Sequence, residues 1–241
     1  MPVATIDLVI AFAVTFFAAA IQGTVGMGFA IVSVPLLSIV DPRLAPVPQL
    51  LVSIPLIVTM AYRERQHIEF RGLRWILAGR IPGALIGLAL LKIATETTLS
   101  LMIAGIVLIA VSALASGVAL ARSPKVDFLA GTFSGISSLI SSIGGPPLAL
   151  LFSREKPPTI RANMAALFIV GLTITLITRL AAGEITRLDA KIAAILVPAL
   201  AGGFLMSTRL TARLPQSKAR AAILWLSSGS ALALAVRTVV Q

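Results

Sequence analysis

The sequence predicts an all-α integral membrane protein built as two inverted repeats, each a broken or re-entrant helical segment followed by three transmembrane helices. Three observations predict this fold class. Long apolar runs recur along the chain, two glycine-rich breaks interrupt them, and one half of the sequence matches the other at a fixed offset. The mean hydropathy of +1.01 and the 12% share of charged residues do not fit a soluble globular core.

Six apolar runs are each close to the ~20 residues that a helix needs to cross a bilayer. They cover residues 44–62, 73–91, 99–121, 159–179, 190–210 and 219–240. No stretch between them is long enough to form a soluble domain. The whole chain is therefore expected to lie in or next to the lipid bilayer.

The two halves match at an offset of 116 residues, and the matches include glycine, proline and arginine as well as common apolar residues. Gly28 aligns with Gly144, Pro42 with Pro158, Thr59 with Thr175, Arg63 with Arg179, Arg71 with Arg187, Pro82 with Pro198 and Gly87 with Gly203. We therefore predict a first transmembrane repeat over residues 5–121 and a second over residues 123–240, which together form one membrane domain.

Each repeat opens with an apolar segment that glycine interrupts, over residues 8–40 in the first and 128–152 in the second. In the first segment, the apolar pieces at 8–21 and 29–40 are short for a ~30 Å hydrocarbon core at ~1.5 Å per residue. We expect two half-helices that meet inside the membrane. Irregular backbone at that depth is tolerated only where it is buried in protein or lines a wet cavity.

The positive charges in the connectors favour a topology in which each broken segment turns back within the membrane, rather than one in which it crosses the membrane. If the segments cross, ten Lys and Arg residues lie inside and nine outside, which is no bias. If they turn back and the N-terminus is outside, the second repeat is inverted and thirteen lie inside. The six that then lie outside are Arg43, Lys92, Arg179, Arg187, Lys191 and Arg237.

Both breaks precede a helix start, near Gly28 and near Pro146, and a helix start offers unpaired N–H groups and partial positive charge. Two such starts that face one cavity form a site for a small anion. The predicted substrate-binding residues at the breaks are Gln22, Gly23, Thr24, Gly26, Gly28, Ser138, Ser141, Ser142, Gly144 and Gly145. The alternative for such small residues is tight helix packing, which we favour for Gly83, Gly87, Gly202 and Gly203.

Arg80 is the eleventh predicted substrate-binding residue, because it lies well inside an apolar span. An ionisable side chain at that depth is a functional candidate, although an arginine can also snorkel to the interface. All nine acidic residues lie at or near connectors. No carboxylate is therefore expected within a span to relay protons or to hold sodium.

Other classes of protein fit the composition poorly. The net charge of +11 lies in short connectors, so it does not indicate nucleic acid as a partner. The chain has no cysteine, and its one histidine, His67, lies in a connector, so no metal site and no cofactor are predicted. The serines at 134–138 have no base within a span to activate them, so no catalytic residues and no enzyme activity are expected. A transporter of another small anion, such as a carboxylate, and a non-transporting assembly subunit stay open as alternatives, as does the oligomeric state.

The motif GMGFAIVSVPLL at residues 26–37 precedes GGPPLALL at residues 144–151 by about one repeat length. These motifs and the two related halves resemble the TauE/SafE family of sulfite exporters over essentially the whole chain. The second motif departs from the glycine-run form of that family, with SSIGGPP at residues 141–147. The resemblance implies a bacterial inner-membrane transporter that exports small sulfur-containing anions such as sulfite or organosulfonates, with a small anion and the lipid bilayer as its partners.

Overall fold

The computed structural model describes residues 3–68, 73–213 and 216–240, and every regular element in these ranges is a helix. The first half of the chain contains α1 (Thr5–Val25), α2 (Phe29–Val40), α3 (Val47–Glu64), α4 (Leu73–Ile93) and α5 (Glu96–Ala115). The second half contains α6 (Pro124–Ser141), α7 (Gly145–Leu151), α8 (Pro157–Ala181), α9 (Arg187–Arg213) and α10 (Gln216–Val240). Two short 3-10 turns, η1 (Pro42–Leu44) and η2 (Arg65–His67), flank α3. The aligned residue Arg71 lies outside the described residues.

Local chemistry explains where several helices begin and end. Proline occupies the first turn of α3, α6, α7 and α8, where its missing N–H costs no hydrogen bond. The Thr95 hydroxyl accepts a hydrogen bond from Thr98 N at 3.2 Å and caps α5. The span predicted to reach residue 121 was too long, because α5 ends at Ala115 and Gly117 then adopts a φ of +66°.

Seven helices in the described part of the chain are long and apolar enough to cross a membrane. They are α1, α3 with its flanking turns, α4, α5, α8, α9 and α10. The helices that follow the two breaks are shorter, with 12 residues in α2 and 7 in α7. The chain is therefore an all-helical, multi-pass integral membrane protein, as its hydropathy predicts.

The expectation of two half-helices in the first broken segment was wrong for its first piece. α1 has 21 residues, which is enough to cross the hydrocarbon core at ~1.5 Å per residue. It continues through Gly23, which packs so closely on α9 that an added Cβ would lie 2.1 Å from Ser207 Oγ. It also continues through Thr24, whose hydroxyl donates to Ala20 O at 2.8 Å. The helix ends only at Gly26.

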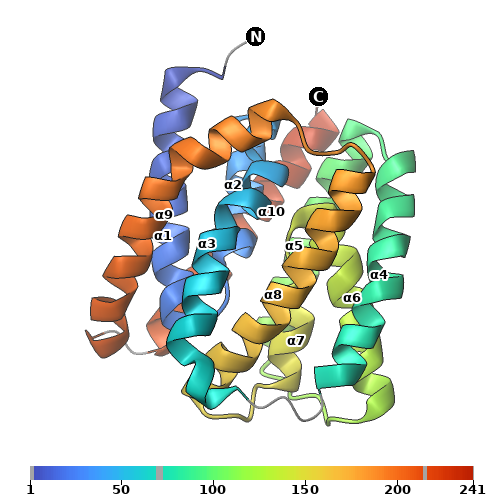
Figure 1. Cartoon of the computed structure of the whole chain (residues 1–241). Coiled ribbons are helices and arrows are strands. Elements are labelled where there is room, and N and C mark those ends of the chain that lie inside the picture. The colour runs from blue at the N-terminus through green and yellow to red at the C-terminus, as the bar shows by residue number, and fades with distance from the viewer. Residues whose placement is uncertain (1–2, 69–72, 214–215, 241) are drawn as a thin grey trace.

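The two halves are packed into one bundle (Figure 1), and their largest contacts run between the halves. α1 packs along α9, and α4 packs along α6. By the 116-residue offset, α6 and α9 are the counterparts of α1 and α4, so this is the same contact made twice. α3 also packs on its counterpart α8, and Figure 1 shows these two helices running in opposite directions.

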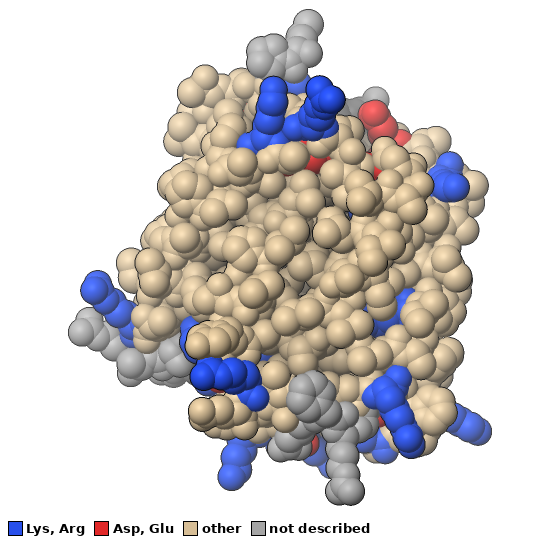
Figure 2. Space-filling model, viewed as in Figure 1, with Lys and Arg blue, Asp and Glu red and all other residues tan. Residues whose placement is uncertain are grey.

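The surface suits a lipid environment. Figure 2 shows Lys and Arg side chains mainly at the two ends of the molecule, with a nearly uncharged belt between them. Large apolar side chains are exposed on the outside of several helices, among them Leu85, Ile109 and Trp225. Helices whose backbone groups are bonded internally can present such a belt to hydrocarbon.

Candidate functional site

The first break, residues 26–28, has a backbone conformation that glycine adopts most easily. The φ angle is +97° at Gly26, which ends α1, and +120° at Gly28, which precedes α2. The Gly26 N–H donates to Gln22 O at 2.7 Å. A Cβ on Gly28 would come within 3.0 Å of the Ile223 side chain in α10, which is tighter than an ordinary contact.

The second break has a different residue at one of the two corresponding positions and keeps glycine at the other. Ser142, the counterpart of Gly26, ends α6 with a φ of +60°. Gly144, the counterpart of Gly28, precedes α7. The Ser134 hydroxyl donates to Gly144 O at 2.5 Å and holds this break against α6.

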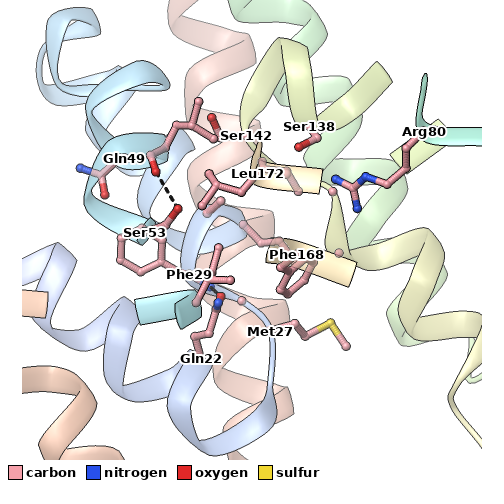
Figure 3. A pocket seen from close by; sticks show the side chains of 18 residues that line it. Gln22, Met27, Phe29, Gln49, Ser53, Arg80, Ser138, Ser142, Phe168 and Leu172 are labelled. Atoms are coloured by element: carbon pink, nitrogen blue, oxygen red, sulfur yellow. Dashed lines mark hydrogen bonds between the residues drawn. The ribbon is translucent and has the colours of Figure 1, made fainter. Parts of the chain in front are cut away.

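Both breaks line one cavity of about 50 Å³ (Figure 3). A single water needs ~10–15 Å³ of such space, so the cavity has room for a small ligand. Residues from α3, α4 and α8 complete its wall. Seven of the eleven predicted substrate-binding residues line it, namely Gln22, Gly28, Arg80, Ser138, Ser142, Gly144 and Gly145.

The other four predicted residues lie at the breaks but not in the wall of this cavity. Gly23 faces α9, and the hydroxyls of Thr24 and Ser141 donate to carbonyls one turn back in their own helices, at 2.8 Å each. Gly26 lies against Arg161, whose Cγ would be 2.9 Å from an added Cβ. These four residues shape the breaks and their packing.

The start of α2 leaves two backbone donors at the cavity. The first hydrogen bond within this helix is that of Val32 N, at 3.0 Å, so the three preceding N–H groups have no partner inside the helix. The Gln22 side chain caps one of them, because its Oε1 accepts from Phe29 N at 2.9 Å. The other two belong to Ala30 and Ile31, which line the cavity. The helix dipole adds partial positive charge at this point.

The start of α7 contributes fewer backbone donors than the start of α2, as its two prolines predict. Pro146 and Pro147 have no N–H group, so only Gly145 among its first three residues has a backbone donor. The two breaks therefore correspond in backbone position but not in the number of donors.

Arg80 of α4 supplies a full positive charge to the cavity. Only 2% of its surface is exposed, so it does not snorkel to an interface, and Figure 3 shows its guanidinium turned toward the other lining residues. Its Nη1 donates to Leu167 O at 3.4 Å. Its guanidinium rests on Gly171 of α8, where a Cβ would lie 2.0 Å from Cζ. Within the described ranges, no carboxylate forms a salt bridge with it.

The sequence did not predict the other residues of the cavity wall, four of which lie on α3 and α8 as two pairs, or the glycine beneath Arg80. Gln49 and Ser53 lie one turn apart on α3, and Phe168 and Leu172 lie one turn apart on α8. Gln49 has the same kind of signal as Arg80, a polar side chain inside an apolar run. Phe168, Leu172 and Gly171 have no such signal, because their place at the cavity depends on how the helices pack.

The two helices that end at a break, α1 and α6, each accept hydrogen bonds in their last turn from an arginine of a neighbouring helix. Arg63, in the last turn of α3, donates from Nη2 to Gly23 O of α1 at 2.8 Å. Arg179, its counterpart in α8, donates from Nε to Leu139 O of α6 at 3.1 Å and from Nη2 to Ile140 O at 3.3 Å. Gly23 and Leu139 are also 116 residues apart. The aligned arginines therefore make the same contact in the two halves.

These features define a class of protein, a multi-pass helical membrane protein with a small cavity where two broken helical segments meet. Many secondary transporters place their binding sites at such breaks. The family model described as "Sulfite exporter TauE/SafE" matches residues 11–234, and the chain belongs to this family. This family consists of membrane transporters and not of enzymes.

One curated relative is the "Probable sulfite/organosulfonate exporter TauE" of Cupriavidus necator, which is 28% identical over 152 residues. The matched region covers 60% of this chain and 59% of the length of that relative. No solved structure matches the chain.

Proposed function

We propose that this protein is a secondary transporter that exports small sulfur-containing anions, such as sulfite or organosulfonates, across a bacterial inner membrane. The family and the name of the Cupriavidus relative support this class of substrate. Transport proceeds by alternating access around the two breaks, with the anion bound in the cavity that both breaks line.

The observation that carries this proposal is the guanidinium of Arg80, buried in that cavity without a carboxylate partner among the described residues. A buried cation at membrane depth is costly unless an opposite charge compensates it. An anion in the cavity faces Arg80 and the backbone donors of Ala30 and Ile31. A guanidinium also matches two oxygens of an oxyanion at once.

We further propose that the halves are inverted repeats with the N-terminus outside. Two corresponding contacts between the halves, α1 with α9 and α4 with α6, support this arrangement. The opposite directions of α3 and α8 support it as well. Three of the six arginines and lysines expected outside have structural partners. Arg179 caps α6, Arg237 donates to Ile39 O at the end of α2, and Arg43 pairs with Asp41 at 2.6 Å. Contacts within the protein therefore account for the positions of these three arginines, in addition to any preference for one side of the membrane.

The membrane potential alone is sufficient to drive this export. It contributes ~2.3 kcal/mol per charge per 100 mV, which is a roughly fiftyfold gradient at ~1.4 kcal/mol per tenfold. The described residues that line the cavity include no Asp or Glu, so no carboxylate there is placed to couple a proton. We therefore propose that efflux is electrogenic and follows the potential.

The test is flux in liposomes that contain the purified protein. Efflux of sulfite or a small organosulfonate should follow an imposed potassium-diffusion potential. Arg80→Ala should lower the rate about tenfold to hundredfold, because a hydrogen bond to a charged group contributes ~1.5–3 kcal/mol. Arg187→Ala removes an exposed arginine and serves as the matched control, with an unchanged rate expected.

Other results would contradict particular parts of the proposal. Flux that ignores the potential but requires a proton or sodium gradient would exclude potential-driven export. Acetate or formate transported faster than any sulfur-containing anion would favour a carboxylate transporter. Folded protein that moves and binds no anion would favour the assembly subunit.

A further inference from the structure

One side of the cavity has a buried hydrogen-bond acceptor, the side-chain oxygen of Gln49. Gln49 has 1% of its surface exposed, and its buried Oε1 has no hydrogen-bond partner among the described residues. Its Nε2 donates to Leu44 O at 3.4 Å, which is consistent with this orientation of the amide. A buried acceptor without a partner destabilises the protein unless a bound group donates to it.

Two serine hydroxyls of the same cavity are also left as acceptors. Ser53, one turn beyond Gln49 on α3, donates its proton to a carbonyl of its own helix at 2.7 Å. Ser142 of the second break donates to the carbonyl that precedes α3 at 3.2 Å. A hydroxyl has one proton to donate, so only the oxygen lone pairs of these serines face a ligand.

The acceptors and the cation lie on different sides of the cavity. Figure 3 shows Gln49, Ser53 and Ser142 together on one side, with Arg80 on the other. Arg80 has only donors and one positive charge. A ligand that spans the cavity therefore meets donors at one end and acceptors at the other.

This polarity restricts the chemistry of the ligand. An oxyanion with no proton of its own would place oxygen against the acceptor side and leave Gln49 Oε1 unpaired. A second negative charge would face no second cation among the described lining residues, and an uncompensated charge is costly at this depth. The best match is a single negative charge with one O–H or N–H group.

We infer that the cavity selects a monovalent sulfonate-type anion that also has an O–H or N–H donor, and that Gln49 recognises this donor. The inference rests on the proposed transport of small sulfur-containing anions and names the feature that separates good substrates from poor ones. Gln49 is then a specificity-determining residue.

The test compares two monovalent anions that differ by one hydroxyl group, ethanesulfonate and 2-hydroxyethanesulfonate. In liposomes that contain the wild-type protein, 2-hydroxyethanesulfonate should be transported about tenfold more efficiently, because a single neutral hydrogen bond changes an affinity by up to about that factor. The same preference should appear in thermal stabilisation of the detergent-solubilised protein, which requires no transport.

Gln49→Leu should bring the ratio of the two transport rates close to one, and Gln49→Met provides an unbranched replacement if leucine disturbs folding. Gln66→Leu is the matched control, because Gln66 is exposed in η2 and should leave the tenfold preference intact. Equal stabilisation and equal transport by the wild type, or an unchanged preference in both Gln49 variants, would overturn this inference and leave sulfonate transport standing. A wild type that neither binds nor moves any sulfonate would overturn both.

Discussion

The guanidinium of Arg80 occupies the space that a side chain at Gly171 would need, since an added Cβ would lie 2.0 Å from Arg80 Cζ. Gly171→Ala should therefore displace the guanidinium and weaken anion binding about tenfold to hundredfold, as expected for the loss of a charged hydrogen bond of ~1.5–3 kcal/mol. Titration calorimetry or ligand-dependent thermal stabilisation measures the change in affinity.

A matched control and a double variant make this prediction specific. Gly105→Ala adds a methyl group where nothing lies within 4 Å, so it should leave anion affinity unchanged. The double variant of Arg80→Ala and Gly171→Ala should bind no more weakly than Arg80→Ala alone, because both changes act through one guanidinium. Additive losses would show that Gly171 acts in some other way.

At the scale of the helices, Arg63 and Arg179 hold the last turns of α1 and α6. Replacing either with Gln should lower thermal stability, because an unpaired buried carbonyl costs ~1–3 kcal/mol. The loss should be larger for Arg179, which donates to two carbonyls of α6, than for Arg63, which donates to one carbonyl of α1. Unfolding followed by the fluorescence of the two tryptophans measures the difference.

Lysine variants separate charge from geometry at these two positions. Lysine offers a point charge rather than a fork of donors, so Arg63→Lys should retain more stability than Arg179→Lys. Arg187→Gln, at an exposed position, should change little. Equal losses in all three arginine-to-glutamine variants would mean that the caps do not stabilise the helices.

The helices were predictable from the sequence to different degrees. Apolar runs of about twenty residues marked six spans, and glycine and proline marked both breaks, because these residues act locally on the backbone. The length of α1 was not predictable in this way. Gly23 and Thr24 resemble part of the break in sequence, yet Gly23 belongs to a helix contact with α9 that only the packed bundle creates.

At the scale of the whole molecule, the proposed inverted arrangement predicts which connectors share one side of the membrane. Single cysteines at Gln66 and Ser153 should react with a membrane-impermeant maleimide from one side only, and a cysteine at Thr97 from the other. All three positions are exposed, and the chain has no native cysteine to add background. Labelling of Gln66→Cys and Ser153→Cys from opposite sides would contradict inversion.

The site could be predicted in outline and not in detail. The aligned breaks and the unusual Arg80 pointed to one shared cavity, because each is an exception to the apolar pattern around it. The place of Gly171 and Phe168 depends on contacts between α4, α6 and α8, which no local pattern encodes. Gln49 was within reach of the same reasoning as Arg80, since both are polar residues within apolar runs.

Arg80 has no counterpart in the second half of the sequence, because the residue 116 positions later is Leu196, which is buried and apolar. In a symmetric dimer of identical halves, every group that one half adds to a shared central cavity is added by the other half too. Such a dimer could place two guanidiniums there or none, and two like charges in about 50 Å³ would repel each other. When both halves belong to one polypeptide, their sequences can differ, so the cavity can have one arginine rather than two or none. A site for a single anion then becomes possible.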